Sequence, residues 1–304
     1  MKLYIAAIIK DEVNSLLEWI AYHKVLGVDG FIIADNDSKD GSRELLDALS
    51  HIENIILIDF PTIAGQKPQL PAYSKILSIC SSDIDFLAFI DADEFLMPLD
   101  SGLSIKEFVE QRFTDESVSA IALNWANFGS NNQMFAEEKL VTERFTRRAP
   151  QRFNVHRNFK SIVRPRQVQH FLNPHFAELR SGRYIDALGR DLVLHPKHGN
   201  GVSAEILWQG ARVNHYAVKS LEEFLLGKHL RGSAATANRV KHKAYFMAHD
   251  RNDEECNLAA NMVPAVKIEI ARLTSQMDSG QISPPSTQSL HQKLHHWWRT
   301  RNDK

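Results

Sequence analysis

Short apolar runs alternate with amphipathic stretches along the first 125 residues, and this alternation constrains the fold more than any other feature. The run 3–9 is continuously apolar, as expected of a strand buried on both faces of a sheet. Apolar residues at helical spacing follow in 13–21, and Gly27 supplies a helix stop. Further strands are predicted at 31–34, 55–60, 86–90 and 118–123, and further helices at 41–50, at 71–81 and after a capping box formed by Ser104 and Glu107. This order predicts right-handed βαβ crossovers, and therefore an α/β fold with a mostly parallel sheet flanked by helices.

The pattern weakens from about residue 126, so the second half is harder to assign. Ser220 and Glu223 form a second capping box that starts a helix, and 254–276 is predicted to be helical with a break or restart at Pro264. We expect a main domain at 1–235, a helical C-terminal extension at 236–280, and a linker with a basic, aromatic tail at 281–304.

Composition narrows the class of protein. Of 304 residues, 43% are hydrophobic and 24% charged, which is typical of a globular chain. Since 36 Lys and Arg balance 37 Asp and Glu, no nucleic acid partner is expected. The run 3–9 is interpreted as a strand and not as a secretion signal, because charged residues follow it at 10–12. Two cysteines, Cys80 and Cys256, suit a reducing compartment, so we expect a cytoplasmic protein.

Residues 144–166 hold eight Arg or Lys and no acid. Three interpretations stay open for this basic segment. It forms a salt-bridged surface, or it lines a site where Lys160 or Arg164 offsets phosphate charge, or it contacts anionic lipid or a charged acceptor. With Trp297 and Trp298 in the tail, it leaves peripheral contact with the inner face of a membrane open.

Acidic residues follow the predicted strands where each strand ends. Asp35 and Asp37 follow the second strand, Asp59 closes the third, and Asp91, Asp93 and Glu94 follow the fourth. The carboxyl ends of parallel strands share one edge of a sheet, where ligands bind, so we expect these acids to converge. A divalent cation or cationic side chains must balance them.

Asp91 and Asp93 are the sharpest element, because two carboxylates that leave a buried strand can hold a hard cation such as Mn²⁺ or Mg²⁺. The alternative is a solvated acidic turn. For Asp35 and Asp37 the alternatives are contact with a nucleoside and the ordinary capping chemistry of a turn.

Three segments resemble the glycosyltransferase family 2 and family 92 group. The opening stretches 10–12, 17–23 and 26–28 are similar to the start of these enzymes, DNDSKDGS at 35–42 to their second-strand motif, and FIDADEFL at 89–96 to their DxD strand, all in matching order. Segments 125–130, 160–165 and 215–220 resemble later motifs. The resemblance covers roughly residues 3–232. It implies a GT-A fold, which is a Rossmann-like domain that binds a nucleotide-sugar with Mn²⁺ or Mg²⁺ at the DxD.

The resemblance also implies roles for individual residues. Nucleotide-sugar contacts fall on Lys10, Glu12, Asp35, Asp37, Gln69, Tyr73, Asp91 and Lys219, with Lys219 at the diphosphate. The metal ligands implied are Asp91, Asp93 and His215. The Glu-Asp pair expected about 100 residues after the DxD has no clear equivalent, so the catalytic base is left unassigned among His175, Glu178 and Asp186.

The function implied is that of a metal-dependent hexosyltransferase acting in polysaccharide biosynthesis. It would move a sugar, with inversion, from a nucleoside diphosphate donor such as a UDP-sugar to a hydroxyl of a glycan or lipid-linked acceptor. The alternatives are a nucleotidyltransferase or phosphohydrolase on a similar sheet, and a non-catalytic protein that binds sugar nucleotides. The donor sugar, the acceptor and the oligomeric state are left open.

Overall fold

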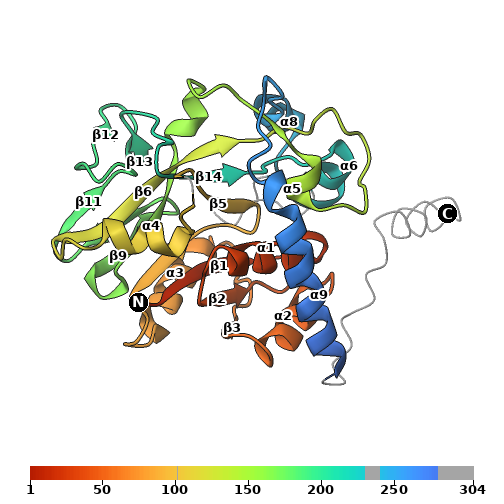
Figure 1. The fold of residues 1–304 in the computed structure, drawn as a ribbon, viewed down its shortest axis with the longest axis horizontal. Coiled ribbons are helices and arrows are strands. Elements are labelled where there is room, and N and C mark those ends of the chain that lie inside the picture. The colour runs from red at the N-terminus through yellow and green to blue at the C-terminus, as the bar shows by residue number, and fades with distance from the viewer. Residues whose placement is uncertain (101, 230–239, 280–304) are drawn as a thin grey trace, which may run out of the picture.

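A computed structural model describes residues 1–100, 102–229 and 240–279 of the chain. Its centre is a sheet that holds nine strands within these residues, in the order β3-β2-β1-β4-β8-β6-β14-β5, with β11 paired to β6 beside this path (Figure 1). The strands are β1 (Leu3–Ile9), β2 (Gly30–Asp35), β3 (Ile55–Asp59), β4 (Phe86–Phe89), β5 (Glu94–Pro98), β6 (Val118–Asn127), β8 (Phe159–Val163), β11 (Arg183–Ile185) and β14 (Ala211–His215).

The first four strands pair in parallel, as the alternating pattern predicted. β1 lies between β2 and β4, and β3 pairs with the outer side of β2. β8 then runs antiparallel between β4 and β6, β14 is parallel to β6, and β5 is antiparallel to β14. The predicted α/β fold with a mostly parallel sheet is therefore confirmed, and it agrees with the GT-A architecture that the resemblance implied. Strand β5 was not predicted, because residues 94–96 were interpreted only as part of a motif.

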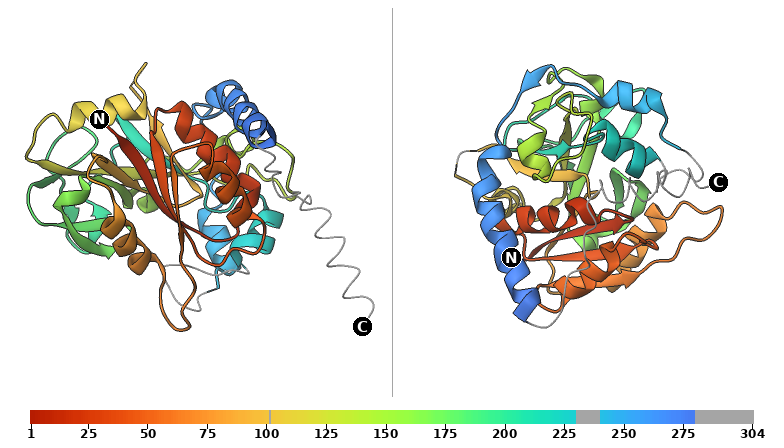
Figure 2. Two further views of the ribbon diagram at one scale, coloured as in Figure 1. Left: turned by 90° about the horizontal axis from the view of Figure 1, so that it is seen from below. Right: turned by 90° about the vertical axis from the view of Figure 1, so that its right-hand side faces the viewer.

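Helices cover both faces of the parallel half (Figure 2). Helices α1 (Val13–Val25), α2 (Ser42–Ser50), α4 (Ile105–Arg112) and α9 (Val263–Ser279) pack on one face, and α3 (Gln69–Ile79) packs on the other. The alternation within β1 explains this arrangement, since Ile5 and Ala7 join the core under α1 while Ala6 and Ile8 join the core under α3. Gly27, with φ of 87°, ends α1 as predicted.

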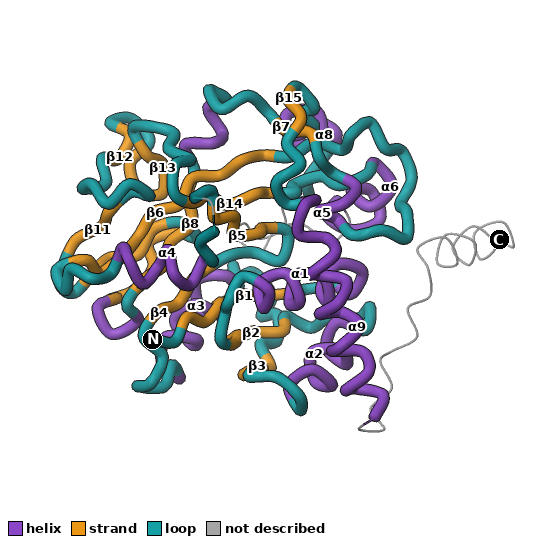
Figure 3. The backbone as a smooth tube through the Cα atoms, viewed as in Figure 1, coloured by secondary structure: helices purple, strands orange, loops and turns teal. Residues whose placement is uncertain are grey.

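The second half is built largely from loops and short elements (Figure 3). These are α5 (Val141–Arg144), β7 (Arg147–Arg148), η1 (Asn154–Arg157), η2 (Pro165–Gln167), β9 (Val168–Asn173), β10 (Phe176–Leu179), β12 (Leu194–His195), β13 (Gly199–Ser203), α6 (Leu221–Glu223), the π-helical turn η3 (Phe224–Lys228), α8 (Lys243–His249), β15 (Glu254–Glu255) and η4 (Ala260–Met262). Both predicted capping boxes are present, at the starts of α4 and α6.

The predicted helix at 254–276 is correct only in its second part. Residues 254–255 pair with β7 as strand β15, and the helix α9 begins at Val263 with Pro264 in its first turn, where the missing N–H is tolerated. The boundaries at 235 and 280 stay predictions, and the linker and tail at 281–304 lie outside the described residues. None of the described helices is long and apolar enough to cross a membrane.

Candidate functional site

The parallel strands place their carboxyl ends at one edge of the sheet. Ile9 is in register with Asp35, and Asp35 with Asp59, so β1, β2 and β3 end side by side. Strand β4 is parallel to β1 and ends just before Asp91, at the same edge. Asp59 does not lie with the other strand-end acids, because its side chain is 81% exposed and forms an ion pair with Arg43. The other strand-end acids form separate clusters along this edge.

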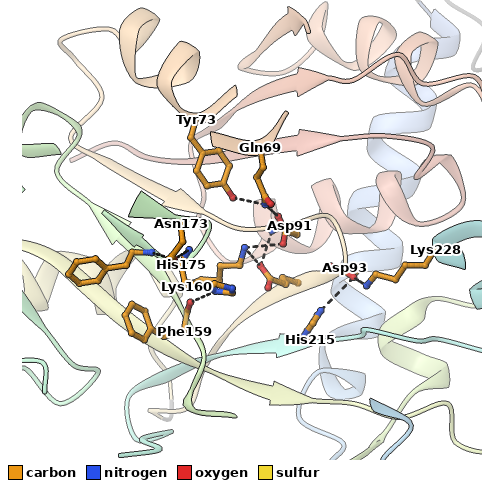
Figure 4. A network of polar contacts seen from close by, with 12 residues as sticks. Gln69, Tyr73, Asp91, Asp93, Phe159, Lys160, Asn173, His175, His215 and Lys228 are labelled. Carbon is orange, nitrogen blue, oxygen red and sulfur yellow. Dashed lines mark hydrogen bonds and ion pairs between the residues drawn. The ribbon is translucent and has the colours of Figure 1, made fainter. Parts of the chain in front are cut away.

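Asp91 lies in a network that joins helix α3 to strand β8 (Figure 4). Gln69 donates from Nε2 to Asp91 Oδ1 at 2.8 Å and to the Tyr73 hydroxyl at 3.2 Å. The Lys160 ammonium donates to Asp91 Oδ2 at 2.9 Å. The structure therefore brings together three of the residues predicted to contact the nucleotide, Gln69, Tyr73 and Asp91, and adds Lys160.

Glu94 shares the Lys160 ammonium at 3.3 Å and accepts a hydrogen bond from the Asp91 backbone N–H at 2.8 Å. Both Glu94 and Lys160 are almost fully buried. Burial raises the pKa of Glu94 to about 8, although Lys160 opposes the shift. Burial would lower the pKa of Lys160, but Asp91 and Glu94 outweigh it and raise that pKa well above its usual range. One buried cation thus balances two carboxyl groups.

Asp93 points to the other side of the turn, toward His215 at the end of β14 and Lys228 in η3 (Figure 4). His215 Nε2 lies 3.6 Å from Asp93 Oδ2, and the Lys228 ammonium forms an ion pair with the same oxygen. Lys228 also donates to the Ala217 carbonyl at 3.0 Å. Burial would raise the pKa of Asp93, but Lys228 and His215 outweigh it and hold that pKa well below its usual range. Burial lowers the pKa of His215, which favours the neutral imidazole.

No sequence pattern predicted a role for Lys228. It lies 135 residues from Asp93, and neither a capping box nor a motif extends to it. Lys160 was one of two candidates within the basic segment to offset negative charge, and it does so at Asp91 and Glu94. Arg164 does not, because its guanidinium donates to the Val118 and Phe113 carbonyls.

The remaining residues predicted to bind the nucleotide lie around β1 and β2. Asp37, with φ of 57°, accepts from the Thr62 backbone N–H at 2.7 Å, and Lys10 donates to the Thr62 hydroxyl at 3.4 Å. Asp35 is buried, and burial raises its pKa. Its Oδ1 has no hydrogen-bond partner among the described residues.

Lys219 is also at this edge. Its Nζ donates to Ser15 Oγ at 2.8 Å and lies 3.8 Å from Glu12 Oε2. Its backbone adopts φ of 53°, which directs the chain from His215 into the capping box of α6. Glu12 and Lys219, which were each predicted to contact the nucleotide-sugar, are therefore brought together.

The three candidate bases differ in their surroundings. Asp186 stabilises the loop in which it lies, since its carboxylate accepts hydrogen bonds from the Leu188 and Arg190 backbone N–H groups and from the Arg190 side chain. Glu178 is on the surface of β10, 3.3 Å from His170. Only His175, of these three, belongs to the network in Figure 4. Its Nδ1 is 2.9 Å from the Phe159 carbonyl and donates to it, which leaves Nε2 as the acceptor. Burial, aided by Lys160, lowers the pKa of His175 to about 4.

Trp125 on β6 lies between the Asp91 cluster and the Asp93 cluster. Its ring centroid is 5.1 Å from that of His175 and 4.3 Å from that of His215. The indole thus separates the histidine beside the Asp91 cluster from the histidine beside Asp93.

The donor atoms around Asp93 suit a hard divalent cation. A carboxylate oxygen, a neutral imidazole and the Ala217 carbonyl are ligand types that Mn²⁺ accepts. Asp91 is turned toward Gln69 and Lys160, so the three predicted ligands are divided between two clusters. No group of three His, Cys, Asp or Glu side chains arranged for a metal was found within the described ranges. A cation at Asp93 would therefore need further ligands from its substrate or solvent.

Comparison with known proteins assigns the family. The model of glycosyltransferase family 92 matches residues 7–199. A family 92 protein of Ricinus communis is 31% identical over 189 residues, covering 58% of this chain and 31% of its own length, and one of Oryza sativa subsp. japonica is 26% identical, covering 62% and 32%. The chain thus spans about a third of the length of these relatives. A crystal structure of S. aureus TarS 1-349 in complex with UDP superposes with 12% identity and a TM-score of 0.34, over 54% of this chain and 47% of that chain. Because the family model matches well over half of the residues, the chain belongs to glycosyltransferase family 92.

Proposed function

We propose that this protein is a glycosyltransferase that moves a sugar from a nucleoside diphosphate to a hydroxyl group and depends on Mn²⁺ or Mg²⁺. The observation that carries the proposal is the pair of carboxylates after β4. Asp91 and Asp93 each form an ion pair with a lysine at the carboxyl edge of a parallel sheet. Family membership adds the reaction class, and the resemblance of the opening motifs makes a UDP-sugar the first donor to test.

The residues of the two clusters have different roles in binding the donor and the cation. Asp93 and His215 would hold the cation, which when bound neutralises charge on the departing diphosphate. Asp91, fixed by Gln69 and Lys160, would orient the nucleotide. Glycan or lipid-linked alcohols are the acceptors proposed, with inversion at the anomeric carbon. We assign the cytoplasm as the compartment, where two free thiols persist.

Titration with UDP tests the proposal without knowledge of the sugar. We expect UDP to bind in the presence of Mn²⁺ and to bind at least about tenfold more weakly with EDTA, because a bound cation would neutralise charge on the diphosphate. A screen of nucleotide-sugars should then identify one donor that is slowly hydrolysed. UDP binding that ignores Mn²⁺ and is accompanied by no turnover would contradict the proposal, as would fast hydrolysis of many different nucleotides.

The variant Asp93→Asn sharpens the test, because it keeps the shape of the side chain and removes its charge. We expect it to lose the Mn²⁺-dependent part of UDP binding and to lower donor hydrolysis by about 100-fold or more. Asp59→Asn is the matched control, since Asp59 ends the parallel strand β3 but its side chain is 81% exposed. Calorimetry and a hydrolysis assay on both variants check the prediction, and equal losses in the two would refute it.

A further inference from the structure

The Lys228 ammonium occupies the position of a cation at Asp93. It pairs with Asp93 Oδ2 (Figure 4). It also donates to the Ala217 carbonyl at 3.0 Å, so Nζ contacts two oxygens. His215 Nε2 is 3.6 Å from the same carboxylate oxygen. These are the donor atoms that were identified above as suited to a divalent cation, so the ammonium and such a cation compete for one place.

The surroundings make this competition strong. The Lys228 and Asp93 side chains are 14% and 10% exposed, so the pair is shielded from solvent. The Lys228 ammonium is in direct contact with Asp93 Oδ2, whereas His215 Nε2 lies 3.6 Å from that oxygen, so Lys228 is the nearer of these two groups to the carboxylate. A divalent cation that binds Asp93 therefore has to displace Lys228, and the displaced ammonium needs a new anionic partner.

We infer that Lys228 is an exchangeable ligand of the site: it neutralises Asp93 in the empty protein, gives up this carboxylate to the divalent cation, and then binds the diphosphate of the donor. The inference rests on the proposed function and extends it by assigning the diphosphate contact. Because the lysine is flexible and its charge stays within the site, it links cation binding to nucleotide binding.

Lys219, which the sequence suggested for the diphosphate, is less suited to this role. Its Nζ already donates to Ser15 Oγ at 2.8 Å and lies 3.8 Å from Glu12 Oε2. Lys228 is the residue whose ammonium contacts Asp93, the carboxylate proposed above to hold the cation. Lys219 is thus held beside Glu12 and Lys228 beside Asp93.

The test separates exchange from a merely structural role by the sign of two effects. Lys228→Met removes the competitor, so the variant should bind Mn²⁺ alone about tenfold more tightly than the wild type, as measured by electron paramagnetic resonance. The same variant should bind UDP in saturating Mn²⁺ about tenfold more weakly, as measured by calorimetry. Lys228→Arg keeps the charge and should retain most of the UDP affinity.

Lys243→Met is the matched control, because it removes the same charge from the exposed first turn of α8. It should change neither affinity. If Lys228→Met weakens both ligands, or changes neither, exchange is refuted while the proposed function stands. If the wild type binds neither Mn²⁺ nor UDP, the proposed function fails instead.

A measurement on the wild type guards against misfolding of the variant. Acetylation of lysines with an amine-reactive reagent, read by mass spectrometry, reports the accessibility of each Nζ. Lys228 should label slowly in EDTA, several-fold faster in Mn²⁺, and slowly again in Mn²⁺ with UDP, while Lys243 labels alike in all three. A Lys228 labelling rate that does not respond to Mn²⁺ would overturn the inference.

Discussion

At the scale of single residues, buried charges decide how the site is built. Lys160 is 1% exposed and Glu94 is fully buried, so neither charge is solvated by bulk water. A buried ammonium is stable only when carboxylates and hydrogen bonds replace its hydration. Lys160 therefore has to face Asp91 and Glu94, and this requirement fixes the turn that follows β4.

Lys160→Met should destabilise the fold strongly. It leaves Asp91 and Glu94 without their shared cation, and breaking a buried ion pair in this way costs about 3–5 kcal/mol. Adding Asp91→Asn removes the carboxylate that Lys160 contacts at 2.9 Å, so the double variant should be more stable than Lys160→Met alone. Urea unfolding of the wild type, both single variants and the double variant measures this. Strictly additive effects would show that the two side chains are not coupled.

At the scale of elements, the position of helix α9 against the core was the hardest to predict from the sequence. The spacing of its apolar residues predicts a helix. The neighbouring sequence does not indicate that Val266, Leu273 and Met277 pack into the core that includes α1. The capping boxes at Ser104 and Ser220 are the opposite case, because both partners lie within one turn and need no tertiary contact. Figure 2 shows α9 lying along α1.

Two substitutions within α9 should separate its buried face from its exposed face. Leu273 is fully buried, so Leu273→Ala should lower the free energy of unfolding by about 2–5 kcal/mol through lost contacts and a cavity. Ile268 is 73% exposed, so Ile268→Ala should change it by about 0.5 kcal/mol or less. Chemical denaturation provides both values. Comparable effects of the two substitutions would mean that α9 does not dock on the sheet domain in solution.

At the scale of the whole molecule, several histidines are buried in their neutral form. Burial lowers the pKa of His23 to about 3, and of His156, His175 and His249 to about 4. His156 is held between main-chain groups, since Nδ1 faces the Gln151 carbonyl and Nε2 accepts from the Asn127 N–H. Protonation would break the second of these hydrogen bonds.

The free energy of unfolding should therefore decrease as the pH falls. A histidine whose pKa is lower in the folded state contributes stability above its ordinary value of 6.5, and this contribution is lost as the pH drops toward 4. For His156 the loss between pH 7 and pH 5 should be about 2 kcal/mol. Glu94 acts in the opposite sense, because its raised pKa favours the folded state at low pH and this contribution is lost as the pH rises through about 8.

A single substitution isolates the contribution of His156 from the others. Unfolding free energies at pH 5 and pH 7 should differ less in His156→Gln than in the wild type, by about 2 kcal/mol. His51→Gln is the control, because the His51 side chain is 59% exposed. An unchanged pH dependence in His156→Gln would rule out the neutral buried state of this residue.

Much of the sheet and part of the site could be predicted from the sequence, because their signals are local. Five of the nine central strands follow from runs of apolar residues, and the acids after β2 and β4 follow from the rule that parallel strands end at one edge. The roles assigned to Asp37, Asp91 and His215 remain predictions. Strand β5 was missed because a short apolar run directly after two acids does not distinguish a turn from an edge strand.

What the sequence determined by itself was the alternation of strands and helices, the ends of helices at caps and glycines, and the acidic character of one sheet edge. These depend on residues within a few positions of each other, where backbone geometry and side-chain spacing act directly. Tertiary structure alone decided that Lys160 serves Asp91 and Glu94 and that Lys228 serves Asp93, across 69 and 135 residues of chain. The two residues of an ion pair need no fixed separation in the sequence, because any cation that the fold brings close can balance a buried carboxylate.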